Sequence, residues 1–297
     1  MKESVQRIQN LLRVSSLNQV ERKRLVKESL QPIPRLLRVL GLLNQVEKVR
    51  YITAVMASYR KNAVFCRDNP GFAVPPKHLA YDAYNRLDWS FYKTSGEQTA
   101  IYFAGIIKNY EKQTESAPLN ILEWGCGPGR VVRHLPSLFG SRGQIYGTDY
   151  NAETVHWCKK NIPQVHFEIN GLYPPLNFED ERFDAVYAIS VFTHLSEEIG
   201  RLWINELERI TASKGLIVFT VNGDSLKRYL LPDELAKYES YGFVERSNYQ
   251  EGKKWFSTFH SPQYVAKSFL THMEVLEHRT DGFYANIQDV WIARKRD

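Results

Sequence analysis

Three glycines at alternate positions could form a ligand-binding turn. Gly125, Gly127 and Gly129 directly follow the apolar run 120–124. Glycine tolerates positive φ, and without a Cβ its backbone lets N–H groups approach a ligand. Twenty residues past Gly129, Asp149 ends a second apolar run, where a carboxylate can accept hydrogen bonds from ribose hydroxyls. This pair of features predicts a nucleoside-containing ligand at the carboxyl ends of two neighbouring strands.

The residues beside these glycines narrow the class of ligand. A dinucleotide site would follow the pattern GxGxxG, with a helix N-terminus facing a pyrophosphate. Arg130 occupies the position of the third glycine in that pattern. Glu123, two residues before the first glycine, would repel a pyrophosphate and attract an ammonium group. Both residues favour a cofactor in which an amino acid is joined to adenosine.

The elements that must position these residues alternate between strand and helix. Short apolar runs at 120–124, 144–148, 165–169, 184–190 and 216–221 are typical of buried parallel strands. We expect two more strands at 273–279 and 288–294, joined by a short loop and paired antiparallel at the sheet edge. The alternation predicts a doubly wound α/β sheet with helices on both faces.

Capping residues predict where several helices begin and end. Ser95, with Gln98 three residues later, has the capping-box pattern and predicts a helix to about residue 110. Ser196 is expected to cap the helix after the fourth strand, and Gly215 to close the turn that follows it. Ser261, followed by proline, predicts another helix start.

Composition bounds the class of protein. The chain has 297 residues, of which 43% are hydrophobic, so it can bury the core of a catalytic domain and carry an appendage. Three cysteines without CxxC spacing predict free thiols, a reducing compartment and no structural zinc. Neither a signal-peptide pattern nor an apolar run of about 20 residues is present, so we expect a cytoplasmic protein.

The positive charge gathers near the N-terminus. Residues 1–62 hold 13 Lys and Arg against 4 Asp and Glu, a charge of +9, while the rest of the chain sums to −3. Helical spacing of apolar residues over 36–55 indicates amphipathic helices there. We expect residues 1–75 to be a basic helical extension that associates with itself or contacts an anionic partner, although charge patterning alone favours a solvated basic helical face.

The remainder, 76–297, is the expected catalytic domain. Its segment 121–130 resembles motif I of the class I S-adenosylmethionine-dependent methyltransferases, and similar segments follow at 145–149, 183–186, 190–195 and 214–216. The chain is also similar to bacterial small-molecule and sugar-pathway methyltransferases. The resemblance implies a Rossmann-like seven-stranded sheet and S-adenosylmethionine as cofactor. Residues 224–260 break the strand–helix rhythm and are interpreted as an insertion after strand five that forms a lid.

The resemblance also implies a role for each residue around the cofactor. The methionine part would be surrounded by Glu123, Gly125, Gly127 and Gly129, and the ribose would be held by Asp149. The adenine would be bordered by Tyr150 and by Asn170, Gly171 and Leu172. Family members often place an acid at the position of Asn170, whose side-chain oxygen can still accept a bond from the adenine amino group. Ser190 is expected near the sulfonium.

Two histidines are candidates for a general base. His194 follows the fourth strand, and His260 precedes the helix at Ser261 within the expected lid. Either could take a proton from an acceptor hydroxyl, and either could instead be a structural histidine.

Two kinds of acceptor are disfavoured by the sequence after strand four. Enzymes that methylate base or amide nitrogens commonly carry Asn/Asp-Pro-Pro-aromatic there, whereas this chain has Ser190-Val191-Phe192. Catechol-type enzymes need an acid at the same place to help bind magnesium. We therefore expect metal-independent methylation of a hydroxyl on a small molecule, a sugar or a secondary metabolite. An RNA-modifying enzyme that uses the basic arm, and a non-catalytic scaffold with this fold, remain as alternatives.

Overall fold

The computed structural model describes residues 43–111, 117–246, 250–253, 255–280, 282–283 and 286–297. The chain forms two compact units, Met1–Ala57 and Ser58–Asp297, and helix α4 (Leu43–Asp68) runs through their boundary. The helices expected before residue 43 lie outside the described residues. Residues 58–75 belong to the second unit, where the Asn62 side chain bonds Leu87 O and Trp89 N, both at 3.0 Å. The functional boundary at residue 75 stays a prediction.

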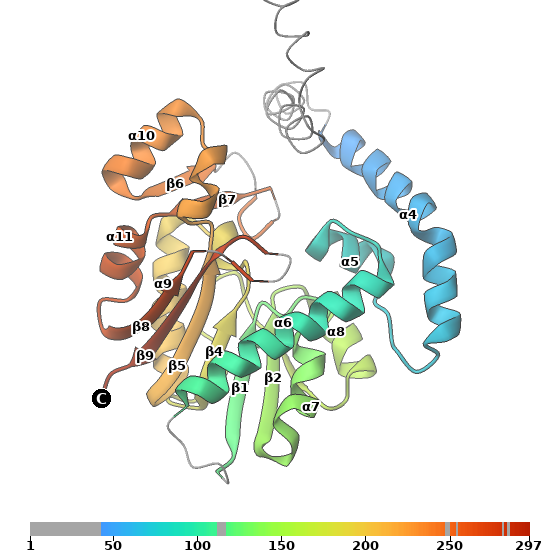
Figure 1. Ribbon diagram of the computed structural model, residues 1–297, viewed down its shortest axis with the longest axis horizontal. Coiled ribbons are helices and arrows are strands. Elements are labelled where there is room, and N and C mark those ends of the chain that lie inside the picture. The colour runs from blue at the N-terminus through green and yellow to red at the C-terminus, as the bar shows by residue number, and fades with distance from the viewer. Residues whose placement is uncertain (1–42, 112–116, 247–249, 254, 281, 284–285) are drawn as a thin grey trace, which may run out of the picture. The chain divides into compact units, whose positions relative to one another are not determined.

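The second unit is built on a seven-stranded sheet in the order β3-β2-β1-β4-β5-β9-β8 (Figure 1). Its strands are β1 (Leu119–Trp124), β2 (Gly143–Asp149), β3 (His166–Ile169), β4 (Phe183–Ala188), β5 (Thr211–Val221), β8 (Met273–Arg279) and β9 (Asp289–Lys295). The first five are parallel, and β9 pairs antiparallel with both β5 and β8. The doubly wound fold and the antiparallel final strands are thus confirmed. The strand order reverses between β1 and β4, where ligands bind in such sheets.

Helices cover both faces of this sheet because its strands are apolar on both sides. One face packs against α6 (Trp89–Tyr110), α7 (Leu135–Phe139) and α8 (Ala152–Asn161) through a core that includes Ile121 and Val218. The other packs against α9 (Glu197–Ile210) and η5 (Val265–Phe269) through a core that includes Leu122 and Phe219. Figure 1 shows the sheet between these layers. Short 3-10 turns η1 (Val132–His134), η2 (Gly140–Arg142) and η3 (Phe192–His194) complete the connections.

Two predicted helix boundaries are wrong. Helix α6 begins at Trp89, where Asp88 caps it by accepting from Phe91 N at 3.1 Å. Ser95 instead lies buried inside the helix and accepts a hydrogen bond from Arg130 Nη1 at 3.1 Å. Ser196 does cap α9, accepting from Ile199 N at 3.3 Å.

Gly215 does not close a turn after α9. Thr211 ends the helix and begins β5 directly, and the irregular pairing of β4 with β5 places a bulge within the strand. The positive φ falls on Lys214, at 62°, rather than on the glycine. The backbone does bend near Gly215, but the bend lies within β5 and not between the helix and the strand.

The segment after β5 forms a small layer of its own. It contains η4 (Asp224–Tyr229), α10 (Pro232–Tyr241) and the antiparallel pair β6 (Phe243–Arg246) and β7 (Ser257–His260), separate from the main sheet. α11 (Pro262–Tyr264) then begins where Ser261 accepts from Tyr264 N at 3.2 Å, as expected. The insertion after strand five is present, and its role as a lid stays a prediction.

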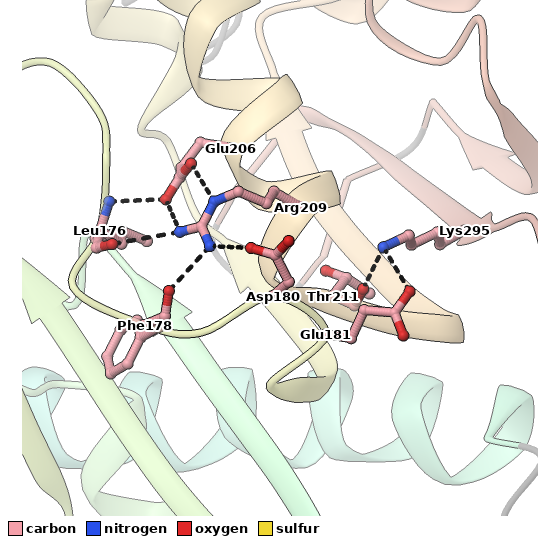
Figure 2. Close-up of polar contacts among 8 residues, drawn as sticks. All are labelled: Leu176, Phe178, Asp180, Glu181, Glu206, Arg209, Thr211 and Lys295. Carbon is pink, nitrogen blue, oxygen red and sulfur yellow. Dashed lines mark hydrogen bonds and ion pairs between the residues drawn. The ribbon is translucent and has the colours of Figure 1, made fainter.

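One ion-pair network holds the β3–β4 connection against α9 (Figure 2). Arg209 bonds both carboxylate oxygens of Glu206, at 2.6 and 2.9 Å, and Asp180 Oδ1 at 2.6 Å. It also donates to the carbonyl oxygens of Leu176 and Phe178. Because Glu206 is buried and accepts from Leu176 N as well, removing the arginine would leave a buried carboxylate short of partners.

Candidate functional site

The turn after β1 can be made only by glycine at two places. Gly125 and Gly129 have φ of 75° and 72°. A Cβ would stand 2.3 Å from the Val191 side chain at Gly125 and 2.4 Å from the Ile162 side chain at Gly129. The N–H groups of Gly125 and Cys126 both donate to Thr148 O at 2.8 Å, which ties the turn to the end of β2. The turn is therefore a rigid cradle between neighbouring strands.

Asp149, at the end of β2, holds the same turn. Its Oδ2 accepts from Gly127 N at 2.9 Å, and its Oδ1 accepts from Asn151 N at 2.8 Å. Burial raises the pKa of this carboxyl, and the two N–H groups oppose that rise. Each oxygen has a further lone pair for a ligand hydroxyl. The predicted ribose acid thus joins the glycine turn to the next strand.

Glu123 is a buried acid beneath the turn. It is 3% exposed and accepts from Tyr187 Oη at 2.8 Å. Burial raises the pKa of Glu123 to about 8, although the Tyr187 hydrogen bond and the Arg130 charge act in the opposite direction. A carboxyl with so raised a pKa gains most from a cationic group brought beside it. This arrangement fits the ammonium-binding role expected for Glu123.

These groups meet in a cavity of about 240 Å³ at the carboxyl ends of β1, β2 and β4. It is lined by nearly all of the residues assigned to the cofactor: Glu123, Gly125, Gly127, Asp149, Tyr150, Asn170, Gly171, Leu172 and Ser190. Gly129 does not line it and packs behind the turn against Ile162. His194 lines the cavity, whereas His260 does not.

Two buried polar atoms in the cavity wall have no hydrogen-bond partner within the described part of the chain. One is Asn170 Oδ1, whose amide nitrogen already donates to Gly171 O at 2.7 Å. The other is Tyr84 Oη, near Gly127 at the end of helix α5 (Lys77–Tyr84). Buried polar atoms are normally satisfied, so these two mark places where a ligand supplies the partner. An adenine amino group fits an orphan acceptor, and a carboxylate fits an orphan hydroxyl.

The sequence did not predict that Tyr84 lines the cofactor site, and Arg130 in the sequence argues only against a dinucleotide pattern. Arg130 carries the single permanent positive charge among the described residues that line the cavity. Its guanidinium lies 5.2 Å from the centre of the Tyr84 ring. No local pattern in 77–84 marks a ligand contact, because the tyrosine reaches the cavity only once α5 packs over the glycine turn.

His194 is held in one tautomer by the inserted segment. Its Nδ1 lies 2.7 Å from Phe256 O, and since a carbonyl only accepts, Nδ1 carries the proton and Nε2 the lone pair. Burial lowers the pKa of His194, with the bond to Phe256 acting against it. The imidazole is therefore neutral at pH 7 and able to accept a proton.

His260 lies in an aromatic core instead. It is 1% exposed, with ring centres of Phe243, Phe269 and Tyr264 at 5.0, 5.4 and 5.9 Å. Burial lowers its pKa to about 3, and its Nδ1 has no partner among the described residues. The structure does not bring His260 together with the other candidate residues.

Gly252 of the inserted segment connects two sides of the cavity that it lines. It accepts from Tyr150 Oη at 3.1 Å and donates from its N–H to His194 O at 2.9 Å. Lys253 places its ammonium 5.0 Å from the centre of the Tyr150 ring. Tyr150, expected beside adenine, and His194, the candidate base, thus contact the same short segment.

Two further findings concern metals and membranes. The described residues contain no cluster of three or more His, Cys, Asp or Glu side chains arranged to hold a metal ion. None of the helices in this described part is both long and apolar enough to cross a bilayer.

Comparison with known proteins gives the domain type. A family model described as a methyltransferase domain matches residues 121–215. A 2-phytyl-1,4-naphtoquinone methyltransferase of Trichormus variabilis is 38% identical over 71 residues, which cover 22% of this chain and 30% of that protein. The match thus spans less than a third of that relative's length.

Solved structures share the fold. A methyltransferase dependent on S-adenosylmethionine from Methanosarcina mazei superposes with a TM-score of 0.50 and 20% identity, covering 64% of this chain and 97% of that one. Magnesium protoporphyrin IX methyltransferase from Synechocystis PCC 6803, solved with bound S-adenosylhomocysteine, gives a TM-score of 0.50 and 13% identity over 82% and 99% of the two chains. Sheet order and glycine cradle agree with the family match: residues 121–215 are similar to a methyltransferase domain, and the fold is shared with a solved methyltransferase that depends on S-adenosylmethionine.

Proposed function

We propose that this protein transfers the methyl group of S-adenosylmethionine to a hydroxyl of a small molecule without a metal ion. The observation that carries the proposal is one cavity lined both by the nucleoside cradle and by His194, whose Nδ1 is taken by Phe256 O, so that Nε2 is the ring nitrogen left to accept a proton. The matched part of the Trichormus relative, whose name states a naphtoquinone substrate, supports a small-molecule acceptor. Ser190, where catechol-type enzymes need an acid, supports independence from magnesium.

The cavity offers complementary groups for each part of the cofactor. Glu123 faces the ammonium, while Arg130 and the orphan hydroxyl of Tyr84 suit the carboxylate. Asp149 suits the ribose hydroxyls, and the orphan oxygen of Asn170 suits the adenine amino group. When bound, the cofactor supplies an electrophilic methyl group on a positively charged sulfur.

The chain itself would contribute alignment and proton removal. His194 Nε2 would take the proton of the acceptor's hydroxyl as the acceptor oxygen displaces S-adenosylhomocysteine from the methyl carbon, and Phe256 O would stabilise the resulting imidazolium through Nδ1–H. His260 lies outside the cavity, so the proposal gives it no contact with the acceptor. The segment around Gly252 serves as a lid that keeps water from the reacting atoms.

The test is transfer of radiolabelled methyl groups from S-adenosylmethionine to the low-molecular-weight fraction of a cell extract. We expect labelled products with wild-type protein, with and without a chelator, and a loss of about 10²- to 10⁴-fold in His194→Gln, the range of general base catalysis. Because the pKa of His194 is lowered, the acid limb of the wild-type rate should lie below pH 6.5.

Controls separate the parts of the proposal. His156→Gln changes a histidine on α8 that is absent from the cavity lining and should retain the rate. Label transferred only to RNA, or a rate abolished by the chelator, would contradict the proposal. An unchanged rate in His194→Gln would refute the role of His194 as general base and leave the other parts of the proposal intact.

A further inference from the structure

A buried polar network stands at the β4 side of the cavity, where β4, β5 and β9 come together. At its centre is Gln288, which is 9% exposed. Its Oε1 accepts from three donors: Ser190 Oγ at 2.7 Å, Thr220 Oγ1 at 2.8 Å and Asn286 Nδ2 at 3.0 Å. Ser190 and Asn286 also line the cavity, so the network connects Gln288 to the cavity wall.

Two backbone groups fix the direction of every hydrogen bond in this network. Thr258 O, which can only accept, takes a bond from Asn222 Nδ2 at 2.9 Å, so Asn222 turns its Oδ1 toward Gln288. Gln288 Nε2 donates to that oxygen at 3.2 Å, which leaves Oε1 facing the cavity side. Independently, Gln288 N donates to Asn286 Oδ1 at 2.9 Å, so Nδ2 of Asn286 must face Gln288 Oε1.

The polarity of Ser190 follows from this relay. Since Gln288 Oε1 cannot donate, the Ser190 hydroxyl must, and its oxygen keeps only lone pairs for the cavity. Ser190 has φ of 61°, an unfavourable value for a residue with a side chain. Its N–H bond to Thr220 Oγ1 at 2.8 Å holds it there, and Thr220 is fully buried. The hydroxyl is thus fixed in place and in direction.

We infer that Gln288 is a positioning residue that makes the Ser190 oxygen a hydrogen-bond acceptor at the methyl-transfer end of the cavity, selecting a methyl acceptor with an O–H to donate. This inference rests on the proposed function and deepens it. His194 lines the same cavity, and because its Nδ1 is taken by Phe256 O, Nε2 is the ring nitrogen left to accept from a ligand. A nucleophile that arrives with an O–H donates to the Ser190 oxygen while its own lone pair points at the methyl carbon. A nucleophile without a proton would meet the lone pairs of Ser190 and be repelled.

Sinefungin tests this polarity without knowledge of the natural acceptor. It is a cofactor analogue whose amine replaces the sulfonium and its methyl group, so it donates hydrogen bonds at the transfer position. S-adenosylhomocysteine has no donor there. Calorimetry of both compounds with the full chain gives a discrimination ratio, Kd of S-adenosylhomocysteine over Kd of sinefungin, which we expect to exceed one in the wild-type protein.

Variants then move the ratio in a defined way. Ser190→Ala should lower it about 10- to 100-fold, the range for a hydrogen bond to a charged group. Ser190→Gly, which suits positive φ, should do the same if the alanine variant folds poorly. Gln288→Met, which frees the hydroxyl to rotate, should lower it about 2- to 10-fold.

Each outcome decides something. Gln98→Met on the exposed side of α6 is the matched control and should leave the ratio unchanged. If Ser190→Ala and Gln288→Met both bind S-adenosylhomocysteine and both keep the wild-type ratio, this inference is overturned while the proposed function stands. A fall in Ser190→Ala but not in Gln288→Met would overturn the part assigned to Gln288. If neither compound bound the wild-type protein, the proposed function would fail and this inference with it.

Discussion

The acid beneath the glycine turn makes the folded protein sensitive to pH. Glu123 is buried, and its pKa is raised from 4.5 to about 8 by burial. A carboxyl whose pKa is higher in the folded than in the unfolded chain contributes stability that is full at low pH and lost as the pH rises to the folded pKa. Glu123→Gln keeps the size of the side chain and removes the titration.

The size of the effect follows from the two pKa values. Each pKa unit corresponds to about 1.4 kcal/mol, so a rise from 4.5 to about 8 removes about 5 kcal/mol of stability between pH 4.5 and pH 8. Within the accessible window, pH 6 to pH 9, the wild-type protein should lose about 2 to 3 kcal/mol through this group. For a unit of this size that is about 5 to 10 °C of melting temperature.

The assay is thermal and urea unfolding of both proteins at intervals from pH 6 to pH 9. Because other groups titrate in both proteins, the informative quantity is the difference in the free energy of unfolding between variant and wild type. We expect Glu123→Gln to gain about 2 to 3 kcal/mol relative to wild type from pH 6 to pH 9. Equal slopes for the two proteins would refute the raised pKa of Glu123.

A second arm of the same experiment connects the acid to the cofactor. Saturating S-adenosylhomocysteine brings an ammonium group to the ionised carboxylate, so the pH slope of the wild-type protein should flatten. The variant should bind this compound about 10- to 100-fold more weakly, the worth of a charged hydrogen bond. A bound wild-type protein that keeps the full slope would show that the ammonium lies elsewhere.

Three further predictions concern the cradle and its surroundings. Asp149→Ala should weaken S-adenosylhomocysteine binding by about 1 to 3 kcal/mol, because it strands Gly127 N–H and the ribose hydroxyls; calorimetry with unchanged affinity would refute that role. The wild-type protein should bind S-adenosylhomocysteine about tenfold more tightly than S-inosylhomocysteine, which lacks the adenine amino group, and Asn170→Leu should abolish this preference. Equal binding of both compounds by the wild-type protein would contradict the contact between Asn170 and the amino group. Gly96→Ala places a Cβ 2.0 Å from Arg130 O and should lower the free energy of unfolding by about 1 to 3 kcal/mol. Gly105→Ala, in the same helix, meets nothing within 4 Å and should not destabilise the protein. Similar melting temperatures for the two variants would argue against close packing at Gly96.

The approximate positions of the strands along the chain and the position of the cradle could be predicted from the sequence alone. Strand runs are local patterns of apolar residues, and β8 lies at the predicted bounds of residues 273–279. Glycine spacing is local too, since positive φ at Gly125 is a demand of the turn itself. Asp149 was found because, in a doubly wound sheet, the residue ending the second strand lies beside the turn after the first.

Boundaries failed where two local signals competed. Ser95 and Gln98 form a valid capping pattern, yet Asp88 begins the helix earlier and leaves Ser95 as a buried partner of Arg130. A capping motif states only that a cap is possible at that residue. Which cap is used depends on which stretch of helix can bury its apolar face, and that is a tertiary property.

Only the tertiary structure decided which polar residues meet in the cavity. Tyr84 and Asn286 line it from segments about 200 residues apart, and no spacing in the sequence connects them. The two histidines carried equal weight in the sequence, and packing placed His194 in the cavity wall and His260 in an aromatic core. Patterns along a chain report the backbone conformation of neighbours, whereas hydrogen-bond direction and burial depend on residues brought together by the fold.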